Sequence, residues 1–185
     1  MSFLSKNKIS FINILKSLDY EKKALKCAEL LKNCNLLNGK IIFLGNGGSA
    51  SIASHVSVDL TKNARIRSIN FNEPDLITCF ANDFGHDNWM KEALKMYSNK
   101  NDIVILISSS GKSKNIINAA KWCLKNSLKI ITFTGHNKNN TLKSLNNKGT
   151  NFWINSKAYN LVELSHLFIL LSIVDLIIGK NIYKA

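Results

Sequence analysis

Residues 41–50, IIFLGNGGSA, contain an apolar run that stops at a turn with three glycines and a serine. A short, solidly apolar run that ends at glycine and leads into a helical pattern is typical of a buried parallel strand and the loop after it. Three interpretations of this loop compete. It binds the phosphate of a small sugar, it binds the pyrophosphate of a dinucleotide, or it holds no ligand.

The rest of the chain repeats this alternation of apolar runs and helical segments. Strands are predicted at 40–45, 66–71, 102–108, 128–135 and 150–155. Helices are predicted at 49–63, at 75–98 in two pieces, and at 113–126, after one long or broken amphipathic helix over 8–37. Apolar strands that alternate with helix-length connections indicate βαβ units. We therefore predict an α/β fold of three layers, with a parallel sheet covered on both faces.

The length and composition fit one globular domain over residues 1–185. The chain has 185 residues, 45% of them apolar, which is enough for a sizeable core. Within it we distinguish an N-terminal helical segment, 1–38, and a C-terminal apolar helix, 159–180. The polar segment 135–149 is predicted to be a surface loop with a short helix, and Pro74 to mark a turn or a first helical position.

The charge is strongly basic, with a formal net charge of +13. Only Arg65 and Arg67 of the 25 basic residues are arginine, so 23 are lysine, and these are scattered along the chain. Specific nucleic-acid sites use mainly arginine forks. The composition therefore argues against dedicated nucleic-acid binding and favours a solvated surface that attracts anions.

Cysteine spacing and the termini indicate the compartment. Cys27, Cys34, Cys79 and Cys123 lie far apart, as expected for core thiols in a reducing environment. The first residues, MSFLSKNKIS, lack the features of a signal peptide, so we expect a cytoplasmic protein. The apolar stretch 161–179 is interrupted by Glu163, His166 and Asp175, which favours a core or interface helix over a membrane span.

A second loop, ISSSGKSKN at 107–115, follows the third predicted strand. It offers four serine hydroxyls near the start of a helix, where backbone N–H groups and the helix dipole favour an anion. They belong to Ser108, Ser109, Ser110 and Ser113. A plain serine N-cap needs fewer hydroxyls, so we favour a phosphate site. Leu106 stands where a Walker loop requires glycine.

The glycine loop also satisfies a weak dinucleotide pattern, GxGxxA, through Gly45, Gly47 and Ala50. The acidic residue expected at the end of the second strand is absent, so we expect no nucleotide cofactor. A third polar element, NDFG at 82–85, is either a turn in which Asp83 caps the next helix or part of the site.

Together, GNGGSA with His55 after it, NDFG and S-x-S-G-x-S resemble the SIS-domain phosphosugar proteins, and most closely the bacterial phosphoheptose isomerases. Order and spacing match over nearly the whole chain. The resemblance implies a five-stranded parallel sheet of flavodoxin-like type. It also implies a homotetramer with active sites between subunits, in which the N-terminal and C-terminal helices form the inter-subunit bundle.

The resemblance also assigns binding residues. It implies that the serine loop binds the substrate phosphate through Ser108, Ser110 and Ser113, with Ser109 beside them. It implies that the sugar hydroxyls contact residues of the glycine loop and of NDFG. These residues are Asn46, Gly47, Ser49 and Asp83.

The catalytic residues depart from the family pattern. The family's histidine and glutamate, four residues apart, read here as His55 and Asp59, on one helical face. Glu163 stands at the glutamine position and Leu171 at the second histidine position, so the mechanism does not transfer intact. His166 follows Glu163 by three residues and is a candidate to compensate. We therefore predict that Asp59 is the proton-transfer carboxylate, supported by His55, Glu163 and His166. Zinc on His55, Asp59 and Glu163, with His166, is a hypothesis.

The resulting prediction is an aldose–ketose isomerase of a sugar phosphate, with sedoheptulose 7-phosphate, destined for lipopolysaccharide or capsule, as the first candidate. Two alternatives stay open. One is an isomerase of another phosphosugar. The other is a non-catalytic SIS protein that binds a sugar phosphate or a protein partner.

Overall fold

The computed structural model describes residues 1–183 and contains one five-stranded sheet. The strands are β1 (Ile41–Leu44), β2 (Ser68–Asn70), β3 (Ile103–Ser108), β4 (Lys129–Thr134) and β5 (Thr150–Trp153). They lie in the order β2-β1-β3-β4-β5, and every neighbouring pair is parallel. This order is that of flavodoxin-like sheets. The predicted sheet is therefore confirmed.

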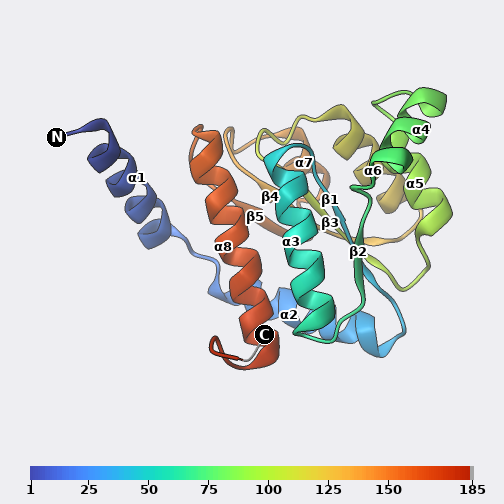
Figure 1. The fold of residues 1–185 in the computed structure, drawn as a ribbon, viewed down its shortest axis with the longest axis horizontal. Helices are drawn as coiled ribbons and strands as arrows, with labels where there is room; N and C mark the ends of the chain where they lie inside the picture. The colour runs from blue at the N-terminus through green and yellow to red at the C-terminus, as the bar shows by residue number, and fades with distance from the viewer. Residues whose placement is uncertain (184–185) are drawn as a thin grey trace.

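Helices cover both faces of the sheet (Figure 1). One face carries α2 (Glu21–Leu36), α3 (Gly48–Lys62) and α8 (Tyr159–Ile178). The other carries α4 (Pro74–Phe84), α5 (Trp89–Tyr97), α6 (Lys114–Lys125) and α7 (Thr141–Leu145). Each face has its own apolar core, so the prediction of three layers is confirmed.

Strand β1 shows why these strands are apolar without alternation. Successive side chains of a strand point to opposite faces of the sheet. Ile41 and Phe43 pack in the core under α3 and α8, whereas Ile42 and Leu44 pack in the core under α5 and α6. Every residue of β1 and of β3 is buried.

The N-terminal segment forms two helices. Helix α1 (Phe3–Ser17) ends before Leu18, whose backbone is extended, and α2 starts at Glu21. Of the two alternatives for 8–37, the broken helix is the observed one. Helix α1 has no buried residue and stands away from the sheet (Figure 1). On α2, Leu25 is exposed, and the smaller side chains of Ala24, Cys27 and Ala28 face the core with Leu31 and Cys34.

Helix α8 is the one helix within residues 1–183 that is long and apolar enough to cross a membrane. Eight of its side chains are buried, and it packs against α2 and α3. It is therefore a core helix. On the outer face of α8, the side chains of Leu164, Phe168 and Leu176 are each about 40% or more exposed.

Several local expectations also hold, and one does not. Pro74 occupies the first turn of α4. Helix α7 lies in the polar segment 135–149 as expected. Three of the four free cysteines are buried, but Cys79 is exposed on α4, because none of the residues of that helix is buried.

Strands β1 and β3 are joined at their amino-terminal ends by Asp102. Its side chain is 1% exposed and accepts hydrogen bonds from the Lys40 N–H at 2.8 Å, the Lys40 Nζ at 2.6 Å and the Asn99 N–H at 2.7 Å. A buried carboxylate is tolerated when its oxygens are satisfied in this way. Asp102 thus connects the residue before β1 to the residue before β3.

We expect Asp102→Ala to lower the free energy of unfolding by about 3 kcal/mol, because it leaves two backbone N–H groups and the Lys40 ammonium without their acceptor. Denaturant unfolding of the variant and of Glu29→Ala, an exposed acid on α2, measures the difference. A loss in Asp102→Ala no larger than that of the Glu29 control contradicts this role.

Candidate functional site

A cavity of about 150 Å³ lies where β1 and β3 end, at the carboxyl edge of the sheet. Both the glycine loop and the serine loop contribute to it, with Glu163 and Tyr159 from the first turn of α8. Seven residues predicted as site residues line it, namely Asn46, Ser49, Ser108, Ser109, Ser110, Ser113 and Glu163. Tyr159 and Ile107 also line it and were not predicted.

The four serines line this cavity, and the Ser113 side chain does not cap the helix. Ser113 is the N-cap of α6, yet its side chain makes no capping hydrogen bond, and its Oγ lies 3.2 Å from the Ser108 Oγ. The Ser109 Oγ is buried and has no hydrogen-bond partner among the described residues. A buried hydroxyl without a partner is costly unless a ligand or water satisfies it. The geometry therefore favours an anion site over a simple N-cap.

The glycines of the first loop permit close packing around the cavity. A Cβ on Gly45 would collide with the backbone of Ser49, so glycine is needed where the strand turns into α3. A Cβ on Gly48 would collide with the carboxylate of Glu163. Glu163 can therefore reach the amino terminus of α3, where the helix dipole favours a carboxylate. Gly47, the N-cap of α3, is exposed and does not line the cavity.

Asn46 joins the two loops. Its Nδ2 donates to the Asn115 Oδ1 and its Oδ1 accepts from the Asn115 Nδ2, both at 3.0 Å. Asn115 is 2% exposed. Asn46 positions the loops through this pair, and it also lines the cavity with one Nδ2 hydrogen and one Oδ1 lone pair left over, so its contact with sugar hydroxyls stays a prediction. The sequence analysis missed Asn115, for which the only signal is an asparagine two residues after Ser113 in a helical segment.

His55 and Asp59 lie together on α3. The His55 Nε2 is 3.3 Å from the Asp59 Oδ2, and the Asn63 Nδ2 donates to the Asp59 Oδ1 at 3.2 Å. The His55 side chain is 53% exposed, and neither His55 nor Asp59 lines the serine cavity. Asp59 follows Ser49 by ten residues, which is about 15 Å along a helix.

The position of His166 corrects its predicted role. It is fully buried under β4, against the ring of Phe133, and its Nε2 donates to the Thr134 carbonyl at 3.1 Å. Burial lowers its pKa to about 4, so the ring is neutral at neutral pH. It packs in the core and does not join His55 and Asp59. The sequence placed His166 on the C-terminal helix, three residues after Glu163. In the structure, α8 packs with the His166 side chain turned into the core.

The residues proposed for zinc are not assembled by one chain. Within residues 1–183, no group of three or more His, Cys, Asp or Glu side chains is arranged to hold a metal ion. Only the His55–Asp59 pair forms, while Glu163 lies at the serine cavity and His166 in the core. Within one chain these residues therefore do not form a zinc site, and no step of the proposed chemistry uses one.

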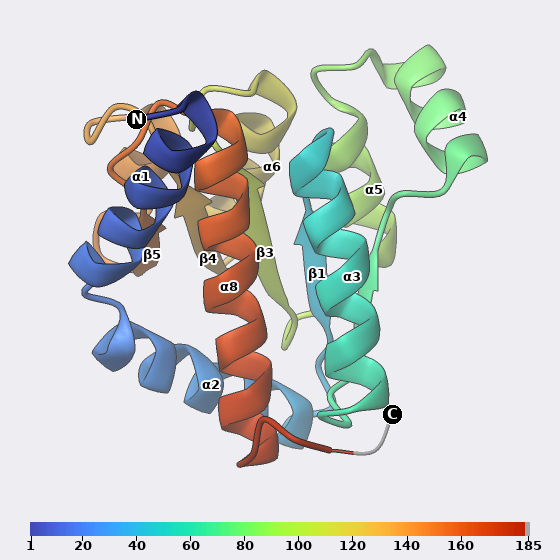
Figure 2. The same ribbon diagram turned by 60° about the vertical axis from the view of Figure 1, so that its left-hand side comes forward.

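Asp83 also lies apart from the cavity. It is exposed in the last turn of α4, where its Oδ1 accepts from the Asn82 Nδ2 at 2.9 Å. Helix α4 stands at the outer corner of the molecule in Figure 2, away from α8. Asp83 does not cap α5, whose N-cap is Asn88. Within one chain, Asp83 is thus not brought to the serines.

The sheet order and the cavity define an α/β protein of the open, doubly wound class, with its site where the strand order reverses. The model of the SIS domain family matches residues 10–135. The chain belongs to the SIS domain family.

Similar proteins agree with this assignment. The chain is 32% identical to a phosphoheptose isomerase of Cytophaga hutchinsonii over 126 residues, 64% of this chain and 66% of the relative. It is 34% identical to one of Shewanella pealeana over 116 residues, 60% of this chain and 59% of the relative. These matches span less than two-thirds of the relatives' length.

Solved structures share the fold over more of the chain. The structure of a phosphoheptose isomerase from Neisseria gonorrhoeae has a TM-score of 0.87 at 22% identity, covering 94% of this chain and 97% of that one. A phosphoheptose isomerase from Francisella tularensis has a TM-score of 0.85 at 23% identity, covering 97% and 100%. At these identities the likeness establishes the fold.

We expect the buried His166 to make stability depend on pH. Its pKa of about 4 is below the ordinary 6.5, so the unfolded chain binds the proton more tightly. The stabilisation is complete above pH 6.5 and is lost as the pH falls towards 4, by about 3 kcal/mol.

Denaturant unfolding between pH 7.5 and 4 checks this expectation. His166→Gln should flatten the profile over this range, whereas His86→Gln, at an exposed position, should leave it unchanged. An equal slope in His166→Gln and the parent protein contradicts it.

We also expect Asn46 and Asn115 to be energetically coupled. A double-mutant cycle of Asn46→Ala and Asn115→Ala should give a coupling of about 1–2 kcal/mol in the free energy of unfolding, because each single change leaves the other amide unpaired. Asn118→Ala, on the same helix, serves as the control partner and should couple to Asn46 by less than about 0.5 kcal/mol. Additivity within the Asn46–Asn115 pair would show that the two loops are held by something else.

Proposed function

We propose that the protein is an aldose–ketose isomerase of a sugar phosphate, acting on sedoheptulose 7-phosphate to form D-glycero-D-manno-heptose 7-phosphate for surface polysaccharide. The observation that carries the proposal is the serine cavity between β3 and α6, in which the buried Ser109 hydroxyl lacks a partner among the described residues. Membership of the SIS family and the phosphoheptose isomerases among its relatives support the substrate class. We also expect the protein to be located in the cytoplasm.

The phosphate end of the sugar binds in the serine cavity. Hydroxyls of Ser108, Ser109, Ser110 and Ser113 donate to phosphate oxygens, and the free N–H groups of the first turn of α6 add to them. At about 150 Å³, the cavity is smaller than the roughly 300–1,000 Å³ usual for a small-molecule site. It holds the phosphate, and the sugar chain extends out of it past Glu163 and Tyr159.

The reaction moves a proton between adjacent carbons of the sugar. Asp59 removes the proton from the carbon beside the carbonyl, an enediol forms, and Asp59 returns the proton to the neighbouring carbon. His55, 3.3 Å from Asp59, exchanges the proton between the two sugar oxygens. A positioned acid–base group of this kind contributes roughly 10²- to 10⁴-fold in rate.

Distances along α3 support an active site shared between copies. Asp59 lies about 15 Å along the helix from Ser49 of the cavity. Bonds of about 1.5 Å give an extended heptose roughly 9 Å between its carbonyl carbon and its phosphorus. Neither His55 nor Asp59 lines the phosphate cavity of its own chain. A second copy that supplies His55 and Asp59 completes the site, in the homotetramer expected for this family.

Exposed apolar side chains mark the surface that such an assembly covers. Helix α1 exposes Phe3 and Leu4, and α8 exposes Leu164 and Phe168. Val58 on α3 is 59% exposed, one residue before Asp59. Figure 2 shows α1, α8 and α3 in front of the sheet, on the same side of the molecule. An apolar surface of this kind is typical of an oligomer interface.

We expect Asp59→Asn to reduce isomerisation by at least about 10²-fold while sugar-phosphate binding persists, because the change removes the base and leaves the phosphate cavity intact.

Ser113→Ala should instead raise KM by roughly tenfold, because it removes one charge-assisted hydrogen bond. Proton NMR with sedoheptulose 7-phosphate in deuterated water follows the aldose anomeric signal and deuterium uptake. Asp75→Asn, an exposed acid on α4, is the control.

One alternative is favoured by a specific residue. Leu171 stands where the family pattern has a histidine, and it packs half-buried against the core. A SIS protein that binds a sugar phosphate without converting it would tolerate this change. Binding of sedoheptulose 7-phosphate without product or deuterium exchange supports that alternative. Turnover of another phosphosugar in its place identifies a different isomerase.

A further inference from the structure

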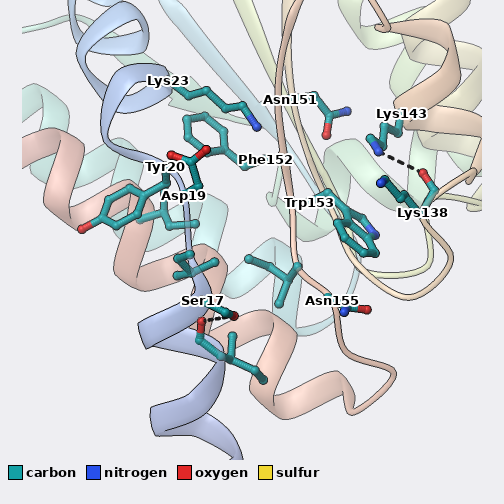
Figure 3. Close-up of a pocket in the computed structure, with 14 residues that line it drawn as sticks. Ser17, Asp19, Tyr20, Lys23, Lys138, Lys143, Asn151, Phe152, Trp153 and Asn155 are labelled. Carbon is teal, nitrogen blue, oxygen red and sulfur yellow. Dashed lines mark hydrogen bonds between the residues drawn. The ribbon is translucent and has the colours of Figure 1, made fainter.

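A second and larger cavity lies at the opposite edge of the sheet from β2. It has a volume of about 430 Å³ and lies between the link from α1 to α2 and the edge strand β5 (Figure 3). Its size is within the roughly 300–1,000 Å³ of small-molecule sites. It shares no lining residue with the serine cavity. We call it the β5 cleft.

Three lysines converge on the β5 cleft. Lys23 comes from α2, and Lys138 and Lys143 come from the segment after β4. Figure 3 shows Lys23 on one side and Lys138 and Lys143 on the other, with the amide of Asn151 between them. Within residues 1–183, none of the three forms an ion pair. Partial burial, and then the charges of Lys138 and Lys23, lower the pKa of Lys143.

The arrangement of Lys143 is fixed by its neighbours. Its Nζ donates to the Lys138 carbonyl at 3.1 Å and lies 5.2 Å from the centre of the Trp153 ring. The Trp153 Nε1 in turn donates to the Gly135 carbonyl at 3.2 Å. Like charges held near one another without a carboxylate partner favour an anion between them.

The same cleft offers acceptors and apolar surface. The Asn151 Oδ1 is buried and has no hydrogen-bond partner among the described residues, although its Nδ2 donates to the Thr132 Oγ1 at 2.7 Å. Asp19 adds an exposed carboxylate at the rim. Tyr20 and Trp153 supply aromatic surface, whereas Phe152 is buried in the core. A ligand that satisfies all these groups carries negative charge, hydroxyl donors and a flat apolar ring.

We propose that the β5 cleft binds a nucleoside diphosphate. Its phosphates lie among Lys23, Lys138 and Lys143, its ribose hydroxyls donate to Asp19, and its base packs against Tyr20 and Trp153. Lys23 lies on one side of the cleft and Lys138 and Lys143 lie on the other (Figure 3), so two linked phosphates can contact both sides, which favours a diphosphate. The Asp19 carboxylate and the aromatic surface of Tyr20 and Trp153 are the observations that favour a ligand with hydroxyls and a ring over an inorganic ion.

The test is a calorimetric titration of the full-length protein with ADP. We expect saturable binding that weakens as salt is added. Lys23→Gln and Lys143→Gln should each weaken it about tenfold, since each removes a charge-assisted hydrogen bond. Lys121→Gln, an exposed lysine on α6, should not change it. In spectra of ¹⁵N-labelled protein, the indole N–H peak of Trp153 should shift, whereas those of Trp89 and Trp122 should not.

Two further titrations distinguish ADP binding in the β5 cleft from binding in the serine cavity and from binding of any polyanion. Ser110→Ala alters the serine cavity, and ADP binding should survive it. Inorganic pyrophosphate carries the charge without ribose or base and should bind at least tenfold more weakly than ADP. The proposal is overturned by any of four results: no binding at millimolar ADP, binding unchanged in both lysine variants, binding lost in Ser110→Ala, or pyrophosphate binding as tight as ADP binding.

Discussion

The pairing of β1 with β3 is the constraint on which the site depends. The chain joins these strands at both ends, through Asp102 with Lys40 at the amino-terminal edge and through Asn46 with Asn115 at the carboxyl edge. Between them the register is continuous from Ile41 opposite Ile103 to Leu44 opposite Leu106. The two loops after these strands therefore emerge side by side, with little freedom to separate.

That pairing also explains why the cavity forms where it does. In the order β2-β1-β3-β4-β5, the chain reverses direction across the sheet between β1 and β3, and their helices leave to opposite faces. The space opened there is closed by the first turn of α8, whose Glu163 meets Gly48. The glycine loop of the first strand thus has a packing function. It lets α8 approach closely enough to complete the wall opposite the serines.

The sequence predicted most of the fold because its strands are apolar on both faces and its helices have recognisable ends, such as Pro74 for α4. It also predicted the serine cavity, since Ser108 to Ser113 are adjacent in sequence. His166 and Asn115 show where it could not succeed. Which face of the nearly uniformly apolar α8 turns inward depends on its packing against β4, and the Asn46–Asn115 pair joins residues 69 positions apart. Neither relation leaves a local pattern.

The contacts of Asp59 with His55 and Asn63 lie within helix α3. Asp59 has one oxygen beside His55, four residues before it, and the other beside Asn63, four residues after it. Residues four apart lie on one helical face, so a single helix fixes the carboxylate.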